Sequence, residues 1–142
     1  FYIPRHLFAI FLEPPELVGG TPWFLRPSIK GTALFMTSPA LLWIFAGLRH
    51  VRRDAALAAA ALAALLPLVP DILHGTVGFA QFGYRFSLDA QPFLIALAVA
   101  GDARTADGWR PRPSWLFMAF IALSVVINLY ATIAITRFGY WQ

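Results

Sequence analysis

Cysteine is absent from this sequence of 142 residues, and charged side chains are scarce. Without a thiol, the chain can form no disulfide and offers neither a thiolate metal ligand nor a cysteine nucleophile. Charged residues account for 13% of the chain, against roughly 25% in an average soluble domain. The basic residues are almost all arginine and stand at the ends of apolar runs, without the interleaved aromatic residues typical of nucleic-acid binding. We therefore expect no nucleic-acid partner.

Apolar residues, by contrast, make up 59% of the chain, and the mean hydropathy is +0.67. A soluble domain of this size could not bury so much apolar surface, because a small domain keeps a large share of its surface in contact with water. A lipid bilayer can cover that surface. The composition therefore predicts an all-α integral membrane protein.

About four transmembrane helices are predicted. Their approximate ranges are 32–48, 55–73, 82–100 and 115–135. Pro39 should kink the first helix, and Pro67 and Pro70 predict a kinked or partly unwound end to the second. The apolar stretch that begins at Leu88 is too short to cross about 30 Å of hydrocarbon at a rise of about 1.5 Å per residue. The third helix is therefore expected to begin near Phe82.

The first 31 residues are apolar but interrupted by prolines and glycines, so they cannot form a further span. A short helix from Pro4 to Leu12 is predicted within them. Residues 1–31 form either an interfacial segment on the periplasmic side of the membrane or an ordered loop packed on the helix ends. Residues 32–142 are expected to form the four-span bundle. Because the chain begins at Phe1 and no signal peptide precedes it, we expect it to be part of a longer protein.

The distribution of arginine predicts the orientation of the bundle. Residues 49–54 and residues 101–114 each include three arginines, whereas the loop between the second and third helices contains only Arg85. Cytoplasmic loops carry an excess of basic residues, so both arginine-rich loops are expected in the cytoplasm and both termini in the periplasm. Basic residues in the leading segment run against this assignment. The expected location is the inner (cytoplasmic) membrane of a bacterium, as a multi-pass protein.

Polar residues gather at the outward ends of the predicted second and third helices. If the third helix begins near Phe82, Arg85 and Asp89 fall in its first turns, where their i, i+4 spacing allows an ion pair on one face. Asp71 and His74 lie at the same depth, at the end of the second helix. We therefore predict a polar cluster composed of Asp71, His74, Tyr84, Arg85, Asp89 and Gln91.

This cluster has two interpretations. It could bind an anionic headgroup, a lipid phosphate or a sugar, or it could be a polar clasp that fixes the two helices to each other. The clasp is favoured, because no second acid and no metal-ligand spacing accompanies the pair. His74 could be an axial ligand of haem or of a chlorin magnesium, but nothing beside it supports ligation. No metal, no cofactor other than a bound lipid, and no catalytic residue is predicted. Asn128, inside the fourth helix, is interpreted as an interhelical hydrogen-bonding residue.

A resemblance to a known family is carried by three stretches of sequence: YIPRHLFAIFLEPP, PWFLRPSIKGTALFMTSPALL and QFGYRFSLDAQPFLIALAVAG. With the asparagine-bearing last helix, they resemble the C-terminal region of bacterial GT-C-type polytopic membrane glycosyltransferases and their uncharacterised relatives. The resemblance covers most of the chain and implies a helical bundle and a polyprenyl-phosphate sugar donor. It also implies that Tyr84, Arg85 and Asp89 help to hold a lipid phosphate. The family's catalytic acid comes from an outward loop that has no counterpart here, so the activity is not carried over.

Two functions are left open by the sequence. In the first, the chain is a non-catalytic accessory or structural subunit that packs through its helices against other transmembrane subunits of a bioenergetic or photosynthetic complex. In the second, it is the C-terminal fragment of a GT-C-type glycosyltransferase. The small size and the missing catalytic loop favour the first. The expected partners are membrane lipids and other transmembrane subunits.

Overall fold

The computed structural model describes residues 2–17, 25–26, 31–73, 85–105 and 108–138 of the chain. These residues are mostly helical, which confirms the all-α class. The helices are α1 (Tyr2–Phe11), α2 (Leu34–Thr37), η1 (Pro39–Trp43), α3 (Ile44–Leu48), η2 (Val51–Arg53), α4 (Ala55–Leu73), η3 (Arg85–Ala90), α5 (Gln91–Ala103) and α6 (Trp115–Phe138), where η marks a 3₁₀-helix.

Two short antiparallel ladders accompany the helices. The strands β1 (Glu16–Leu17) and β2 (Leu25–Arg26), in the connection between α1 and α2, pair with Glu16 opposite Arg26. The strands β3 (Arg104–Thr105) and β4 (Gly108–Trp109) form a tight hairpin between α5 and α6. Each ladder has two residues per strand, so the ladders shape connections and do not form a sheet of their own.

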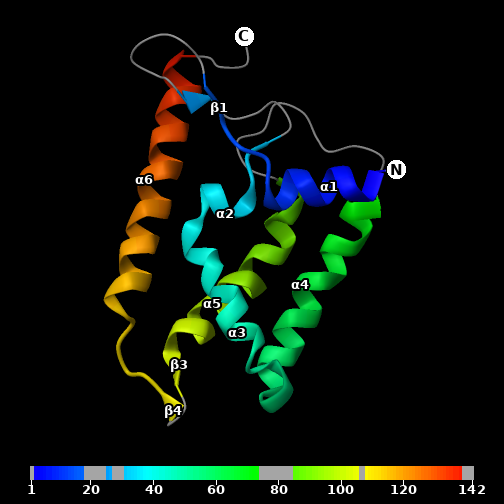
Figure 1. The fold of residues 1–142 in the computed structure, drawn as a ribbon, viewed down its shortest axis with the longest axis vertical. Helices are drawn as coiled ribbons and strands as arrows, with labels where there is room; N and C mark the ends of the chain where they lie inside the picture. The colour runs from blue at the N-terminus through cyan, green and yellow to red at the C-terminus, as the bar shows by residue number, and fades with distance from the viewer. Residues whose placement is uncertain (1, 18–24, 27–30, 74–84, 106–107, 139–142) are drawn as a thin grey trace.

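The helices run alternately up and down, and α1 lies crosswise at one end of the molecule (Figure 1). The broken helix α2–η1–α3 descends to the end marked by the β3–β4 hairpin, α4 returns, α5 descends again, and α6 returns along one side. Both arginine-rich loops therefore lie at the hairpin end, and α6 finishes at the end where α1 lies. The alternating directions of the helices are those that the predicted topology requires. Which side of the membrane each end faces stays a prediction.

Two of the described helices are long and apolar enough to cross a membrane. The candidate spans are Ala55–Leu73, with a mean hydropathy of 2.1, and Trp115–Thr136, with a mean hydropathy of 2.2. Only 11% of each apolar window is buried by the rest of the chain. Helices with so little internal cover present their apolar side chains outward, which is weak support for a membrane location. The fourfold span count stays a prediction.

The first predicted span is broken at the residue that precedes Pro39. Ser38 adopts φ −138° and ψ 73°, outside the helical region, and separates α2 from η1. A proline disfavours helical geometry in the residue before it and lacks the N–H that would continue the hydrogen-bond ladder. The predicted kink at Pro39 is therefore confirmed. The chain continues as 3₁₀-helix to Trp43 before α3 begins.

The second predicted span has the bounds expected from the sequence, because α4 runs from Ala55 to Leu73. It contains both Pro67 and Pro70 and stays α-helical through them. Of the two predicted forms of this end, partial unwinding is therefore wrong as far as Leu73, and a kink stays a prediction. Each proline removes one donor and frees one carbonyl from the ladder, but the surrounding turns keep their helical geometry.

The centre of the molecule is a close contact between α3 and α5. A Cβ atom added to Gly47 would lie 2.1 Å from the carbonyl oxygen of Leu97, and one added to Gly101 would lie 2.1 Å from that of Trp43. Both separations are far below van der Waals contact, so only glycine lets the two backbones approach this closely. Leu94 and Leu97 of α5 are buried in the same core, which also includes residues of α2, η1 and α4.

Candidate functional site

The predicted polar cluster is only partly described by the structure. His74 and Tyr84 lie outside the described residues, as does the side chain of Arg85. Residues Arg85–Ala90 form the 3₁₀-helix η3, in which residues three apart align rather than residues four apart. The α-helical geometry from which the pairing of Arg85 and Asp89 was predicted is therefore absent, because α5 begins only at Gln91. Asp89 is exposed, and the ion pair itself stays a prediction.

The other two members of that cluster lie on separate helices. Asp71 is half-buried near the end of α4, whereas Gln91 is half-buried in the first turn of α5 and lines a cleft that faces α6. Of the cluster, Gln91 is thus the member that the structure places at a cavity.

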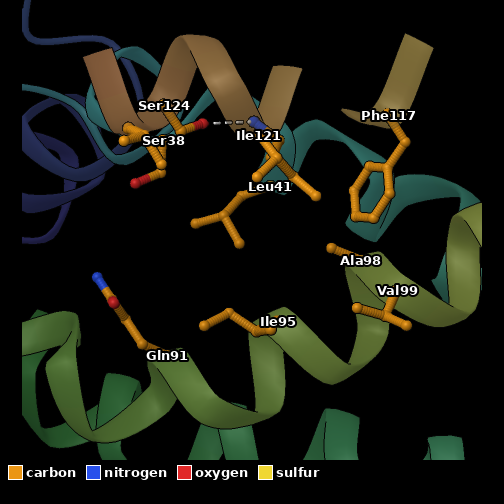
Figure 2. Close-up of a pocket in the computed structure, with 11 residues that line it drawn as sticks. Ser38, Leu41, Gln91, Ile95, Ala98, Val99, Phe117, Ile121 and Ser124 are labelled. Carbon is orange, nitrogen blue, oxygen red and sulfur yellow. Dashed lines mark hydrogen bonds between the residues drawn. The ribbon is translucent and has the colours of Figure 1, made fainter. Parts of the chain in front are cut away.

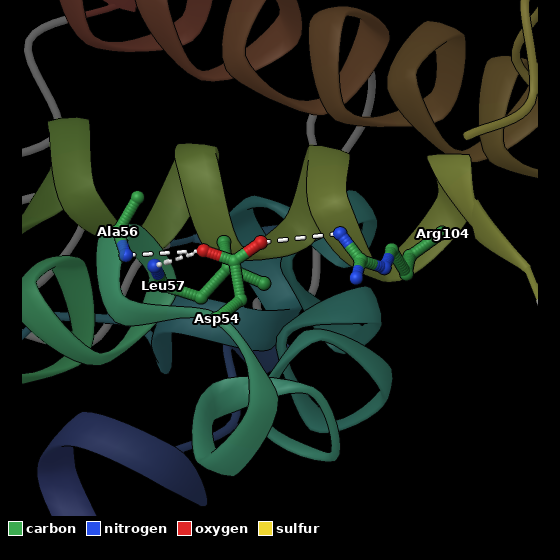
Figure 3. Close-up of polar contacts among 4 residues, drawn as sticks. All are labelled: Asp54, Ala56, Leu57 and Arg104. Carbon is green, nitrogen blue, oxygen red and sulfur yellow. Dashed lines mark hydrogen bonds and ion pairs between the residues drawn. The ribbon is translucent and has the colours of Figure 1, made fainter. Parts of the chain in front are cut away.

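A polar clasp does exist, but at the opposite end of the molecule, where the two arginine-rich loops meet (Figure 3). Asp54 accepts hydrogen bonds from the backbone N–H groups of Ala56 (3.0 Å) and Leu57 (3.3 Å), and so caps α4. Its other carboxylate oxygen accepts a hydrogen bond from Nη1 of Arg104 at 3.1 Å. The guanidinium of Arg104 also lies over the ring of Trp109, 5.1 Å from its centroid. This clasp joins the start of α4 to the β3–β4 hairpin.

A second carboxylate at the same end fixes the start of α6. Asp102, which is buried, accepts hydrogen bonds from the backbone N–H of Ser114 (2.8 Å) and from the Ser114 hydroxyl. The hydroxyl oxygen of Ser114 in turn accepts a hydrogen bond from the N–H of Phe117 (3.2 Å), and so caps α6. The end of α5 is therefore tied directly to the beginning of α6.

Local sequence could have indicated one part of this clasp. An aspartate directly before an alanine-rich helix is a strong capping signal, and Asp54 fits it. Asp102 and Arg104 had no such signal, because their partners are distant in sequence or depend on the hairpin.

The break in the first span is closed by polar groups from α6. The N–H of Ala40 donates a hydrogen bond to Oγ of Ser124 (3.2 Å), and the amide of Asn128 donates to the carbonyl oxygen of Thr37 (2.7 Å). The interruption at Ser38 leaves both of these backbone groups without a partner in a regular helix, and the side chains of α6 supply one. Asn128 thus makes a hydrogen bond between helices.

Aromatic contacts also hold α6 against η1. The Trp43 ring lies 5.3 Å from the ring of Phe117 and 5.1 Å from that of Phe120, centroid to centroid. These separations lie in the range of favourable aromatic pairs. They place the ring of Trp43, the last residue of η1, against the first turns of α6.

A cleft of about 290 Å³ lies between η1, α5 and α6 (Figure 2). Its lining is mostly apolar, with Ser38, Gln91 and Ser124 as the polar members. The remaining lining residues are Ala40, Leu41, Ile95, Ala98, Val99, Phe117, Ile121 and Val125. A mostly apolar cavity with a few polar groups is the usual form of a small-molecule site, so this cleft is the candidate functional site of the described chain.

Among the described residues, no group of three or more histidine, aspartate or glutamate side chains is placed to hold a metal ion. Comparison of the chain with protein-family models, curated proteins and solved structures finds no match. The resemblance to GT-C-type glycosyltransferases therefore stays a prediction, and the function is argued from the geometry.

Proposed function

We propose that this chain is a structural subunit of a larger bacterial membrane complex, and that it packs against other transmembrane helices through α4. The observation that carries the proposal is a line of exposed residues along α4. In order along the helix they are Ala55, Ala59, Leu62, Leu66, Val69 and Leu73, and we call this set the α4 seam.

The α4 seam follows a spacing of four and three residues in alternation. Such a spacing keeps side chains on one line of a helix and is the pattern by which helices pack along a shared axis. Its first members are alanines, which let a second helix approach closely at the end nearest the polar clasp. Its later members are large, and Leu66 is 72% exposed. Nothing in the described part of the chain covers this line.

The ion-pair end of the molecule supports the same proposal. Asp54 and Arg104 fix the relative position of two loops that are rich in arginine, so the α4 seam is presented on a braced frame. A helix face that must meet a partner benefits from such rigidity, because less ordering remains to be done on binding.

The proposal is tested with single-cysteine variants in bacterial membranes, which is practical because the chain contains no cysteine of its own. Leu66→Cys places a thiol-linked photo-crosslinker on the α4 seam, and Leu65→Cys places it on the same helix away from the seam. Leu65 is the matched control, because it is also exposed and apolar. We expect a protein adduct of defined mass from Leu66→Cys and a markedly lower yield from Leu65→Cys.

A second variant tests whether the seam holds the complex together. Ala59→Trp should dissociate the complex on a native gel while the chain stays in the membrane fraction after alkaline washing. Lipid adducts alone from Leu66→Cys, or release of the chain by alkaline washing, would contradict the proposal. Mixed populations with two epitope tags distinguish a second copy of this chain from a different subunit.

A further inference from the structure

The cleft between η1, α5 and α6 is polar at one end and apolar over the rest of its length. In Figure 2 the amide of Gln91 reaches from α5 toward the side of the cleft where Ser38 lies, while Phe117, Ala98 and Val99 are at the other end. Neither the Gln91 amide nor the Ser38 hydroxyl has a hydrogen-bond partner in the part of the chain that the structure describes. Polar groups left open at the edge of an apolar cavity are suited to bind the polar part of a ligand.

Among the described residues, no charged side chain lines the cleft, and this decides the charge of the occupant. A phosphate or a carboxylate placed in the cleft would lose its hydration without gaining a counter-charge, at a cost of several kcal/mol. The head of the ligand must therefore be neutral. A neutral head differs from the anionic lipid phosphate that was predicted to bind around Arg85.

The side chains of Gln91 and Ser38 also determine which hydrogen bonds the polar head of the ligand must make. A primary amide has two donors and one acceptor, and a hydroxyl both donates and accepts. A head with acceptors only, such as a quinone, would leave the carbonyl oxygen of Gln91 unpaired. A head that combines an ester carbonyl with a free hydroxyl can pair with both side chains.

We propose that the cleft binds a neutral glycerolipid of the diacylglycerol type, with its hydroxyl and ester carbonyl at Ser38 and Gln91 and an acyl chain along Ile95, Val99 and Phe117. This site goes beyond the structural role proposed above, and it uses only the membrane setting of that role. The acyl chain buries apolar surface against α5 and α6, and the head satisfies the open polar groups beside the helix break.

The proposal is tested by photolabelling of the full chain in phosphatidylcholine nanodiscs. The probe is a diacylglycerol with a diazirine in one acyl chain, and the comparison probe is phosphatidic acid with the same chains. We expect the diacylglycerol probe to label peptides of α5 and the first half of α6 several-fold more strongly than the phosphatidic acid probe. Unlabelled diacylglycerol should compete, and unlabelled isoprenoid quinone should not.

Two neighbouring valines on α6 supply a matched pair of variants. Val125 lines the cleft and is 60% exposed, whereas Val126 does not line it and is 61% exposed. Val125→Phe should therefore remove most of the cleft labelling, and Val126→Phe should leave it unchanged. Gln91→Leu should lower the apparent affinity by about fivefold, the effect of one hydrogen bond.

Equal labelling by phosphatidic acid would overturn the neutral head, and competition by quinone would overturn the assignment of a glycerolipid. Equal effects of the two valine variants would overturn the cleft itself. The residues of the α4 seam do not line the cleft. Loss of crosslinks at Leu66 with intact lipid labelling would therefore contradict the structural role alone, and the reverse result would contradict the lipid site alone.

Discussion

The helices α5 and α6 are both apolar, yet they are held in the molecule in different ways. The shorter helix, α5, lies in the core, with Leu94, Leu97 and Ala100 buried and its backbone in direct contact with α3. The longer helix, α6, lies along one side and is fastened by a few discrete contacts through Ser114, Ser124 and Asn128 together with the Trp43 ring. Length and hydropathy alone therefore do not indicate which helix is central.

This difference has a physical origin in side-chain size. Gly101 has no side chain to hold α5 away from α3, so the two backbones make many close atomic contacts. No such glycine contact is described for α6, and its position depends on hydrogen bonds at its first turn and at the break before Pro39. Substitutions in α5 should therefore cost more than substitutions in α6.

The largest effect is expected from Gly101→Ala. The new Cβ would lie 2.1 Å from the carbonyl oxygen of Trp43, so α3 and α5 must separate, at a cost of about 3 kcal/mol or more. Thermal unfolding in detergent measures the loss. Ala96→Val adds volume on an exposed position of the same helix and should change stability by less than about 0.5 kcal/mol. Equal effects of the two variants would contradict the close backbone contact.

A smaller loss is expected from Asp102→Ala, which leaves the first turn of α6 without its anchor. Removing a buried carboxylate that accepts two hydrogen bonds from Ser114 should cost about 2 kcal/mol. Protease sensitivity of the 104–114 connection should rise as well. Asp89→Ala removes an exposed carboxylate and serves as the control; an equal loss from it would show that charge, and not the anchor, matters.

Next in size is Asn128→Leu, which removes the hydrogen bond from α6 to the carbonyl oxygen of Thr37. Interhelical hydrogen bonds in membranes contribute about 0.6 kcal/mol on average and at most about 1.7 kcal/mol. Thr132→Val is the control, because the Thr132 hydroxyl bonds only within α6, to the Asn128 carbonyl. Should the control cost as much, the bond between helices is not what holds α6 at the break.

The smallest effect is expected from Arg104→Ala. The ion pair with Asp54 is partly open to solvent, with the two side chains 26% and 20% exposed, so its loss should cost about 1 kcal/mol or less. The difference between wild type and variant should shrink at 1 M salt, which thermal unfolding at two ionic strengths measures. A difference that is independent of salt would indicate that the Trp109 contact dominates.

Local signals in the sequence predicted the elements better than their contacts. The bounds of α4 and the break at Pro39 each depend on nearby residues, and both were predicted correctly. The expected start of an α-helix near Phe82 was not supported, since Arg85–Ala90 are 3₁₀-helix and α5 begins only at Gln91. Pro92, in the first turn of α5, is a local signal for that later start.

The candidate site was harder to predict, because it depends on which helices become neighbours. Gln91 was singled out as part of a charged cluster, whereas the structure places it at an apolar cleft opposite α6. The clasp formed by Asp54 and Arg104 joins residues fifty positions apart, and no spacing rule relates them. The family resemblance added no information about either place.

The order of the helices along the chain has a consequence for biosynthesis. The glycine contact joins α3 to α5, so it can form as soon as Gly101 has left the ribosome, before α6 has emerged. The helix α6 then packs onto the α3–α5 pair, first at Asp102 and afterwards at the break before Pro39. A chain truncated after residue 112 should already contain the α3–α5 contact, and the addition of α6 should complete the lipid-binding face.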